Sequence, residues 1–167
     1  MRTSDKSKRV PRRLGAVAVY IALLLPLLIS MIVFGVDYGT ISVARQEMQV
    51  AADMGAVSTL RVLMFDRDNA DAAALESIGN NSLFRQSIVA DVIDDVEYGI
   101  WDEDTETFTV IPRVDGNPPP GASAVRISLE RTRARGNGIN LFIGPILGNN
   151  FADMSVVAIA AASGTCS

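Results

Sequence analysis

The sequence predicts an α+β protein in which a long N-terminal transmembrane/amphipathic helix packs on a small antiparallel β-sheet head. Three observations predict this fold. Residues 14–36 form a run of 23 residues without a charge. Apolar residues then continue at helical spacing to about residue 64. After residue 95 the pattern changes to short segments in which apolar and polar residues alternate, as in half-buried strands.

The uncharged run is long enough to be a membrane-spanning helix, because about 20 apolar residues cross a hydrocarbon core of roughly 30 Å. Pro26 lies inside it, a defect that spanning helices tolerate. A cleaved secretory signal is the alternative, but its apolar region would be shorter and would end at a small-x-small site. Residues 14–36 are therefore predicted to be a retained anchor in contact with membrane lipid.

The charge distribution predicts the orientation of this anchor. Residues 1–13 hold six Lys or Arg side chains against Asp5 alone, whereas the rest of the chain carries 9 basic and 18 acidic side chains. By the positive-inside rule, residues 1–13 form a basic cytoplasmic tip. The protein is then a single-pass membrane protein whose acidic body lies outside, in the periplasm if the cell has two membranes.

Residues 37–65 are predicted to continue the helix outside the membrane. Their apolar stripe is rich in small residues, which allow a second backbone to approach closely. Two interpretations are open, packing on the chain's own sheet or contact with a partner helix. Asp37, at the exit from the span, either pairs with a neighbouring subunit or is solvated at the headgroups, and Tyr38 suits the interface. The candidate packing residues are Asp37, Tyr38, Ala44, Met48, Ala51, Ala52 and Gly55.

Residues 66–167 form the predicted α+β head. Residues 66–69 break the first helix, residues 70–78 predict a short helix, and residues 82–93 are a second helical candidate. Residues 96–101 and 107–111 predict a hairpin around an acidic turn. Residues 124–130 and 154–162 predict two further strands, with a docked loop or short helix at 139–147 between them.

Composition excludes several kinds of chemistry. The chain has no histidine and one cysteine, Cys166, which excludes a zinc site built on His and Cys clusters and any triad that needs imidazole. The acidic body lacks the clustered Lys and Arg that phosphate contacts need, so no nucleic-acid partner is predicted. We predict no enzyme activity, no cofactor, no metal and no small-molecule substrate.

Four other features are candidate sites, and each has a plainer alternative role. The first is an acidic cluster within residues 102–106, which could hold Ca²⁺. It lacks the spacing of a calcium loop and is expected to be solvated. Asp94 and Asp95 could act as an acid and base, but adjacent residues rarely converge on one atom. Residues 117–121 are expected to be a connecting loop, and Cys166 a bystander near the terminus. The cluster comprises Asp102, Glu103, Asp104 and Glu106.

The N-terminal pattern resembles TadG-like proteins, members of the TadE/TadG group of the Tad (Flp) pilus-assembly systems. The resemblance lies in the start Arg13-Leu14-Gly15-Ala16-Val17, the Leu25-Pro26 pair, the exit Val36-Asp37-Tyr38-Gly39 and the Gln49-Val50-Ala51-Ala52-Asp53 run. It implies a pilin-like head and a role as an accessory or minor-pilin-like component that packs against other pilus subunits. No Asp-x-Ser-x-Ser motif is present, so the resemblance is to a short form without a von Willebrand A-type domain.

The same resemblance makes Gly15 a candidate processing site. Processed pseudopilins carry Glu at the fifth position after the cleaved glycine, and here that position is Tyr20. We therefore predict that Gly15 is not cleaved. Two other functions stay open at this point, a membrane-anchored extracytoplasmic binding or sensor module and a carboxylate-dependent hydrolase of an envelope polymer.

Overall fold

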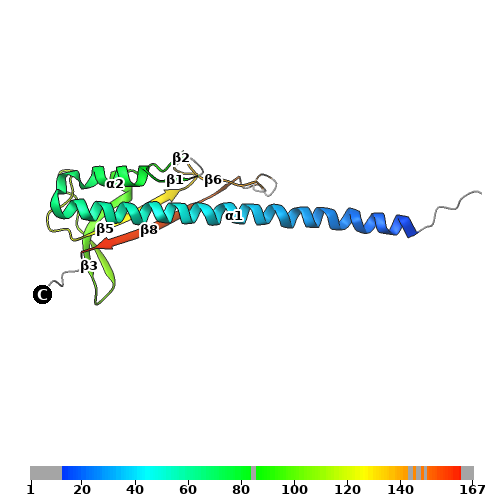
Figure 1. Ribbon diagram of the computed structural model, residues 1–167, viewed down its shortest axis with the longest axis horizontal. Coiled ribbons are helices and arrows are strands. Elements are labelled where there is room, and N and C mark those ends of the chain that lie inside the picture. Colours follow the sequence, from blue (N-terminus) through cyan, green and yellow to red (C-terminus); the bar gives the residue numbers. More distant parts are fainter. Residues whose placement is uncertain (1–12, 84–85, 143–144, 146–147, 149, 163–167) are drawn as a thin grey trace, which may run out of the picture.

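A computed structural model describes residues 13–83, 86–142, 145, 148 and 150–162 (Figure 1). Its longest element is the helix α1, Arg13–Phe65, whose 53 residues extend for about 80 Å. The N-terminal half of α1 projects away from the other elements, and its C-terminal half forms the spine of the head (Figure 1). The predicted continuous helix, from the uncharged run into the head, is confirmed.

Two local features account for the continuity of α1. Pro26 is the one proline within the helix, and Ser30 Oγ donates a 2.8 Å hydrogen bond to its carbonyl oxygen. Beyond Pro26 no further proline interrupts α1, which continues to the polar residues 66–69. There the chain passes into a single 3-10 turn, η1, Arg67–Asn69, and reverses direction.

The helix α2, Ala70–Gly79, follows this turn and lies alongside α1 (Figure 1). It buries Ala70, Ala74 and Ile78, which are spaced four residues apart on one face. The polar residues Asn80 and Asn81 follow its last turn. The helix predicted over residues 70–78 is therefore confirmed.

The helical prediction for residues 82–93 is wrong. The structure has the short strands β1, Ser82–Leu83, and β2, Gln86–Ser87, paired antiparallel, followed by the one-turn helix α3, Val92–Asp95. An extended chain here lets Leu83 and Ile88 enter the core while Val89 stays 84% exposed. Asp91 then starts α3 by accepting hydrogen bonds from the backbone N–H groups of the second and third residues after it.

A four-stranded antiparallel sheet forms the rest of the head, in the order β4-β3-β5-β8. The predicted hairpin and the two later strands are confirmed. A separate pair, β6, Ile139–Asn140, and β7, Phe151–Ala152, begins and ends the segment between the last two strands of the sheet. Part of the loop predicted at 139–147 lies outside the described residues. The four strands are β3, Val96–Asp102, β4, Thr107–Val110, β5, Ala124–Arg131, and β8, Met154–Ala161.

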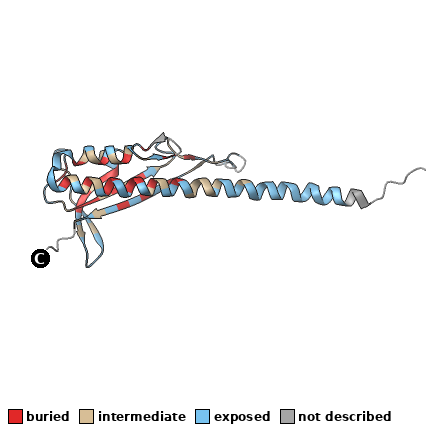
Figure 2. Cartoon of the chain, viewed as in Figure 1, coloured by how far each residue is buried: buried red, intermediate tan, exposed pale blue. Residues whose placement is uncertain are grey.

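The core lies between one face of this sheet and the C-terminal half of α1 (Figure 2). Alternate residues of β5 and β8 point toward the helix, among them Val125, Ile127, Val156 and Ala158. The buried colour in Figure 2 ends where α1 leaves the head. The fold is therefore an α+β unit in which half of one helix is core and the other half is exposed.

Candidate functional site

The projecting half of α1 is apolar on all sides. Apart from the half-buried Val33, the large hydrophobic side chains between Val17 and Val36 are 52–69% exposed, and nothing else in the described chain covers them. Among the described residues, α1 is the one helix that is long and apolar enough to cross a membrane. An apolar surface of this extent is unstable in water, and it marks a contact with lipid or with other apolar helices.

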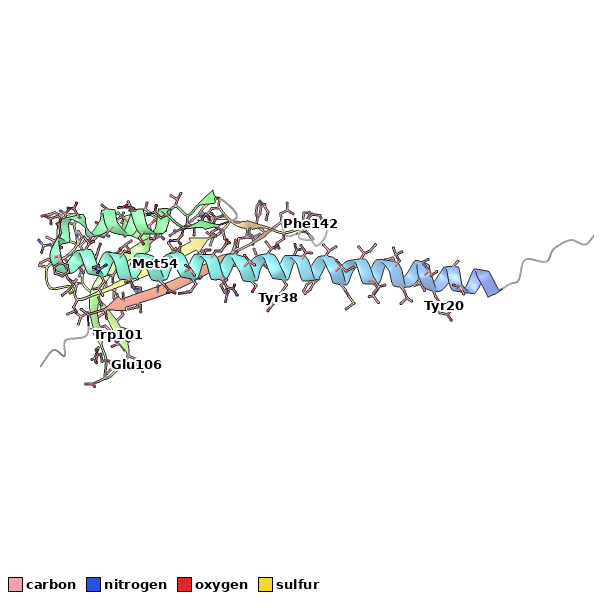
Figure 3. All side chains as sticks on the ribbon, viewed as in Figure 1. Tyr20, Tyr38, Met54, Trp101, Glu106 and Phe142 are labelled. Carbon is pink, nitrogen blue, oxygen red and sulfur yellow. The ribbon has the colours of Figure 1, made fainter. Side chains whose placement is uncertain are left out.

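Asp37 lies at the level where α1 enters the head. Its Oδ1 accepts a 2.6 Å hydrogen bond from the backbone N–H of Phe142, which comes from the loop after β6. The sequence suggested an intermolecular pair or a solvated carboxylate, and the structure shows a contact within the chain. Tyr38 and Phe142 are 71% and 77% exposed beside this contact (Figure 3). This hydrogen bond holds the loop after β6 against α1 where the helix enters the head, and the rings of Tyr38 and Phe142 are both exposed to solvent.

The small-residue stripe of α1 faces the inside of the head. Ala44, Met48, Ala51 and Ala52 are at most 1% exposed, and they belong to the core cluster. A Cβ on Gly55 would lie 2.7 Å from Ile78 of α2 and 2.9 Å from Ile127 of β5. In this structure the stripe therefore packs on the chain's own sheet and on α2, the first of the two interpretations left open by the sequence.

A polar cluster that the sequence analysis missed lies at the far end of the head. The Tyr98 hydroxyl donates a 2.6 Å hydrogen bond to Asp71 Oδ1, and Arg113 makes two hydrogen bonds of 2.7 and 2.9 Å to the same carboxylate. The guanidinium also lies 5.0 Å from the centre of the Tyr98 ring. These residues are 27 and 42 positions from Asp71 in the sequence, so no local pattern points to them.

This cluster joins three parts of the head. Asp71 belongs to α2, Tyr98 to β3 and Arg113 to the loop after β4, and Arg113 Nη2 also donates to the carbonyl oxygens of Val92 and Val96. Burial, together with the hydrogen bond to Asp71, raises the pKa of Tyr98 far above its ordinary value. The hydroxyl therefore stays a donor, and the arrangement is suited to holding the elements together.

The two adjacent carboxylates considered as an acid–base pair have different environments. Asp95 is 2% exposed, and its two oxygens accept hydrogen bonds from Arg135 Nη1 at 2.6 Å and from the backbone N–H of Asp91 at 2.8 Å. Asp94, in contrast, is exposed. Asp95 is thus a buried, paired carboxylate that anchors α3 to the loop carrying Arg135.

The acidic cluster forms the tip of the β3–β4 hairpin, where Figure 3 shows Glu106 at the outer end. Asp102 Oδ1 accepts backbone N–H bonds from Asp104 at 2.9 Å and Thr105 at 3.1 Å. The bonds from Thr105 hold the pKa of Asp102 below its ordinary range. Within the described ranges, no three Asp, Glu, His or Cys side chains are grouped so as to hold a metal ion. The carboxylate of Asp102 therefore stabilises the turn to which it belongs.

The remaining candidates are placed as follows. Residues 117–121 form a loop in which Pro118 and Pro119 are buried. Gly15 lies in the first turns of α1, and its surroundings are outside the described part of the chain. Cys166 is also outside the described residues.

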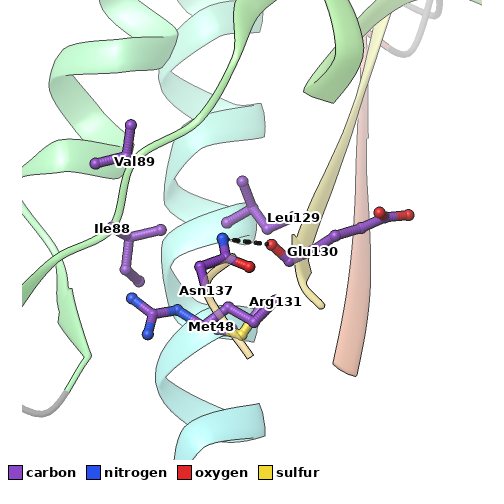
Figure 4. Close-up of a pocket in the computed structure, with 7 residues that line it drawn as sticks. All are labelled: Met48, Ile88, Val89, Leu129, Glu130, Arg131 and Asn137. Atoms are coloured by element: carbon purple, nitrogen blue, oxygen red, sulfur yellow. Dashed lines mark hydrogen bonds between the residues drawn. The ribbon is translucent and has the colours of Figure 1, made fainter. Parts of the chain in front are cut away.

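A cavity of about 210 Å³ opens beside α1 (Figure 4). Apolar and polar side chains both line it, and Asn137 Nδ2 donates a 3.2 Å hydrogen bond to the carbonyl oxygen of Glu130. The cavity is smaller than typical ligand pockets, which occupy roughly 300–1,000 Å³. The lining residues are Met48, Ile88, Val89, Leu129, Glu130, Arg131 and Asn137.

Comparison with known proteins adds the family. A family model described as putative Flp pilus-assembly TadE/G-like matches residues 15–60. A second, described as putative Tad-like Flp pilus-assembly, matches residues 50–160, which is more than half of the chain. No curated protein and no solved structure matches. The two matches meet on α1 and cover both the projecting helix and the sheet, so the chain belongs to the Tad-like family of Flp pilus-assembly proteins.

Proposed function

We propose that this protein is a single-pass, membrane-anchored component of a Tad (Flp) pilus-assembly machine, accessory or minor-pilin-like, that acts by packing against other subunits. The observation that carries the proposal is the two-part helix α1, apolar and exposed over residues 17–36 and buried as the spine of the head further along. Such a helix transmits any contact made in the membrane directly to the head.

The proposed orientation follows from the charges. Residues 1–13 are the basic cytoplasmic tip, residues 14–36 span the inner membrane, residues 37–65 continue the helix outside and residues 66–167 form the periplasmic head. A maleimide that cannot cross membranes tests this in a Cys166→Ser background. Val114→Cys, 52% exposed on the head, should be labelled once the outer membrane is permeable and before the inner membrane is broken. Labelling only after lysis contradicts the orientation.

The proposed partners are membrane lipid and other pilus-assembly subunits. The polar groups of the head support this role over chemistry, because Asp71, Tyr98, Arg113 and Asp95 are bound to one another or to neighbouring backbone. We propose no catalytic activity for the head. We also propose that Gly15 stays uncleaved, in which case mass spectrometry of the native protein finds the N-terminus upstream of Gly15, and an N-terminus at Ala16 contradicts it.

Deletion and complementation of the gene test the function. Loss of the protein should abolish surface pili seen by electron microscopy, and the wild-type gene should restore them. Leu24→Arg places a charge in the span at a cost of about 3 kcal/mol and should fail to restore pili. The matched control Leu24→Ile keeps the span apolar and should restore them. Normal pili in the deletion strain contradict the proposed function.

A further inference from the structure

The part of α1 that lies inside the head has a second, uncovered face. Val43, Val50, Val57 and Met64 recur every seven residues and are 45–61% exposed. Met54 and Arg61 fall between them, four residues after Val50 and Val57, and both are exposed. Glu47 has the same place after Val43, but it is half-buried and already has a partner within the chain. We call the six exposed residues the outer seam. It lies on the opposite side of the helix from the buried stripe of small residues.

The spacing of the outer seam is that of a helix that packs against another helix. Alternating steps of four and three residues, repeated every seven, keep the same face toward a partner when two helices wind around each other. A surface helix that faces only water has no need of such a row of Val and Met. The row therefore fits a second helix beside α1, above the membrane.

The same row continues into the projecting half of the helix through Val36 and Ile29, each again seven residues earlier and 52–53% exposed. A helix lying in this seam would therefore run along α1 into the same bilayer. A partner inserted in the same orientation lies parallel to α1.

Arg61 is the charged member of the seam. It has no ion pair with any described residue. In a parallel pair of two copies of this chain in register, Arg61 would face Arg61, and like charges at such a seam position disfavour the pair. A carboxylate on a different helix at the level of Arg61 would replace this like-charge repulsion with an attraction. The level lies 25 residues after Val36, about 37 Å along the helix.

We propose that the outer seam is the docking site for the parallel, membrane-anchored helix of a different pilus-assembly subunit, with an Asp or Glu of that helix level with Arg61. This proposal rests on the proposed function and names the chemistry of the partner. It also separates two faces of α1, one that builds the chain's own core and one that is available for assembly.

Photo-crosslinking in living cells tests the seam. A benzophenone amino acid in place of Val57, which is 61% exposed, should give an adduct with another protein. The matched control carries the same group in place of Val114, an exposed valine away from the helix. Mass spectrometry should identify the adduct as a single-pass protein with an Asp or Glu about 25 residues after its span. An adduct between two copies, no adduct, or an equal adduct from the control overturns the proposal.

Charge exchange tests the pairing itself. Arg61→Glu should lower the yield of the adduct roughly tenfold, as a like-charge contact replaces an opposite one. Changing the partner's carboxylate to Lys should restore the yield. Arg45→Glu, at an exposed position on another face of α1, should leave it unchanged. An unaffected yield in Arg61→Glu contradicts the pairing. If no adduct forms while deletion still abolishes pili, the seam is refuted and the proposed function stands.

Discussion

Arg113 joins several parts of the head, because its guanidinium donates hydrogen bonds to Asp71 of α2 and to the carbonyl oxygens of Val92 and Val96. Its side chain is 15% exposed and that of Asp71 is 23% exposed, so the ion pair between them is largely shielded from water. Removing one partner leaves the other without its counter-charge, and this loss exceeds the net gain of forming the pair. We expect Arg113 to matter for folding rather than for contacts with partners.

Arg113→Ala should lower the free energy of unfolding of the full chain in detergent by about 2–4 kcal/mol, measured by denaturant titration. The control is Arg133→Ala. The side chains of Arg133 and Asp153 are 55% and 45% exposed, and the distance from Arg133 Nη2 to Asp153 Oδ2 is 3.5 Å, so this ion pair lies at the surface. The control should cost less than about 1 kcal/mol. Equal losses in the two variants would show that the cluster does not stabilise the head.

Tyr98 gives the head a dependence on alkaline pH. Its pKa is raised above the ordinary 10.0 by burial and by the hydrogen bond to Asp71. The neutral phenol is therefore favoured in the folded state, and its stabilisation is complete below pH 10 and is lost as the pH rises toward the folded-state pKa. The unfolding free energy of the wild type should fall by up to about 1.4 kcal/mol per pH unit above about pH 10.

The variant Tyr98→Phe isolates this effect. It loses the hydrogen bond, so it should be less stable at neutral pH, but its stability should fall less steeply between about pH 10 and 11. Denaturant titrations of both proteins at several pH values measure the two slopes. Parallel slopes would contradict the assignment of the alkaline transition to Tyr98.

Individual residues were harder to predict than elements, and the polar cluster shows why. Asp71, Tyr98 and Arg113 meet only because the fold brings the start of α2, strand β3 and the loop after β4 together, and no spacing in the sequence records that meeting. Asp37 was found because it is the first charge after a long apolar run. Its partner, the backbone N–H of Phe142, could not be predicted, because any residue but proline offers that group.

At the scale of elements, α1 contains a close approach that depends on glycine. Gly55 brings α1 against Ile78 and Ile127, where an added Cβ would lie less than 3 Å from their side chains. Gly39 belongs to the same helix, and a Cβ there would meet nothing within 4 Å. Substitutions at these two glycines therefore distinguish the effect of helix propensity on stability from the effect of packing.

Gly55→Val should destabilise the head by about 1–3 kcal/mol, because the core cannot accept the added volume without shifts. Gly39→Ala should stabilise the helix by up to about 1 kcal/mol, since alanine has the higher helix propensity. Thermal unfolding of the full chain in detergent, followed by circular dichroism, measures both. A neutral Gly55→Val would show that α1 does not pack this closely on α2 and β5.

The elements with a clear period were predictable. The apolar run and the helical spacing located α1, and the alternating segments located β3, β4, β5 and β8. The segment 82–93 failed because it is short and its apolar residues fit a helix as well as an extended chain. The core decided between them by taking Leu83 and Ile88 and leaving Val89 in solvent.

At the scale of the molecule, one helix is divided between two environments. Its first half is apolar and exposed, as a helix in lipid would be, and its second half is covered by the sheet and α2. The head is built on the second half of α1, and the hydrogen bond from Phe142 to Asp37 holds the loop after β6 against the helix where its exposed half begins. The molecule is therefore a rod with its head fixed at one end, a form that suits the proposed passing of packing contacts from the membrane to the head.

The distance between the two halves tests this claim most directly. Spin labels at Leu24→Cys and Met54→Cys, in a Cys166→Ser chain in lipid nanodiscs, are separated by 30 residues of α1. Pulsed electron–electron double resonance should give one narrow distribution of label-to-label distances near about 45 Å, the length of 30 residues of unbroken helix. A broad distribution, or one centred well below that length, would show that the helix is interrupted between membrane and head and would contradict the account.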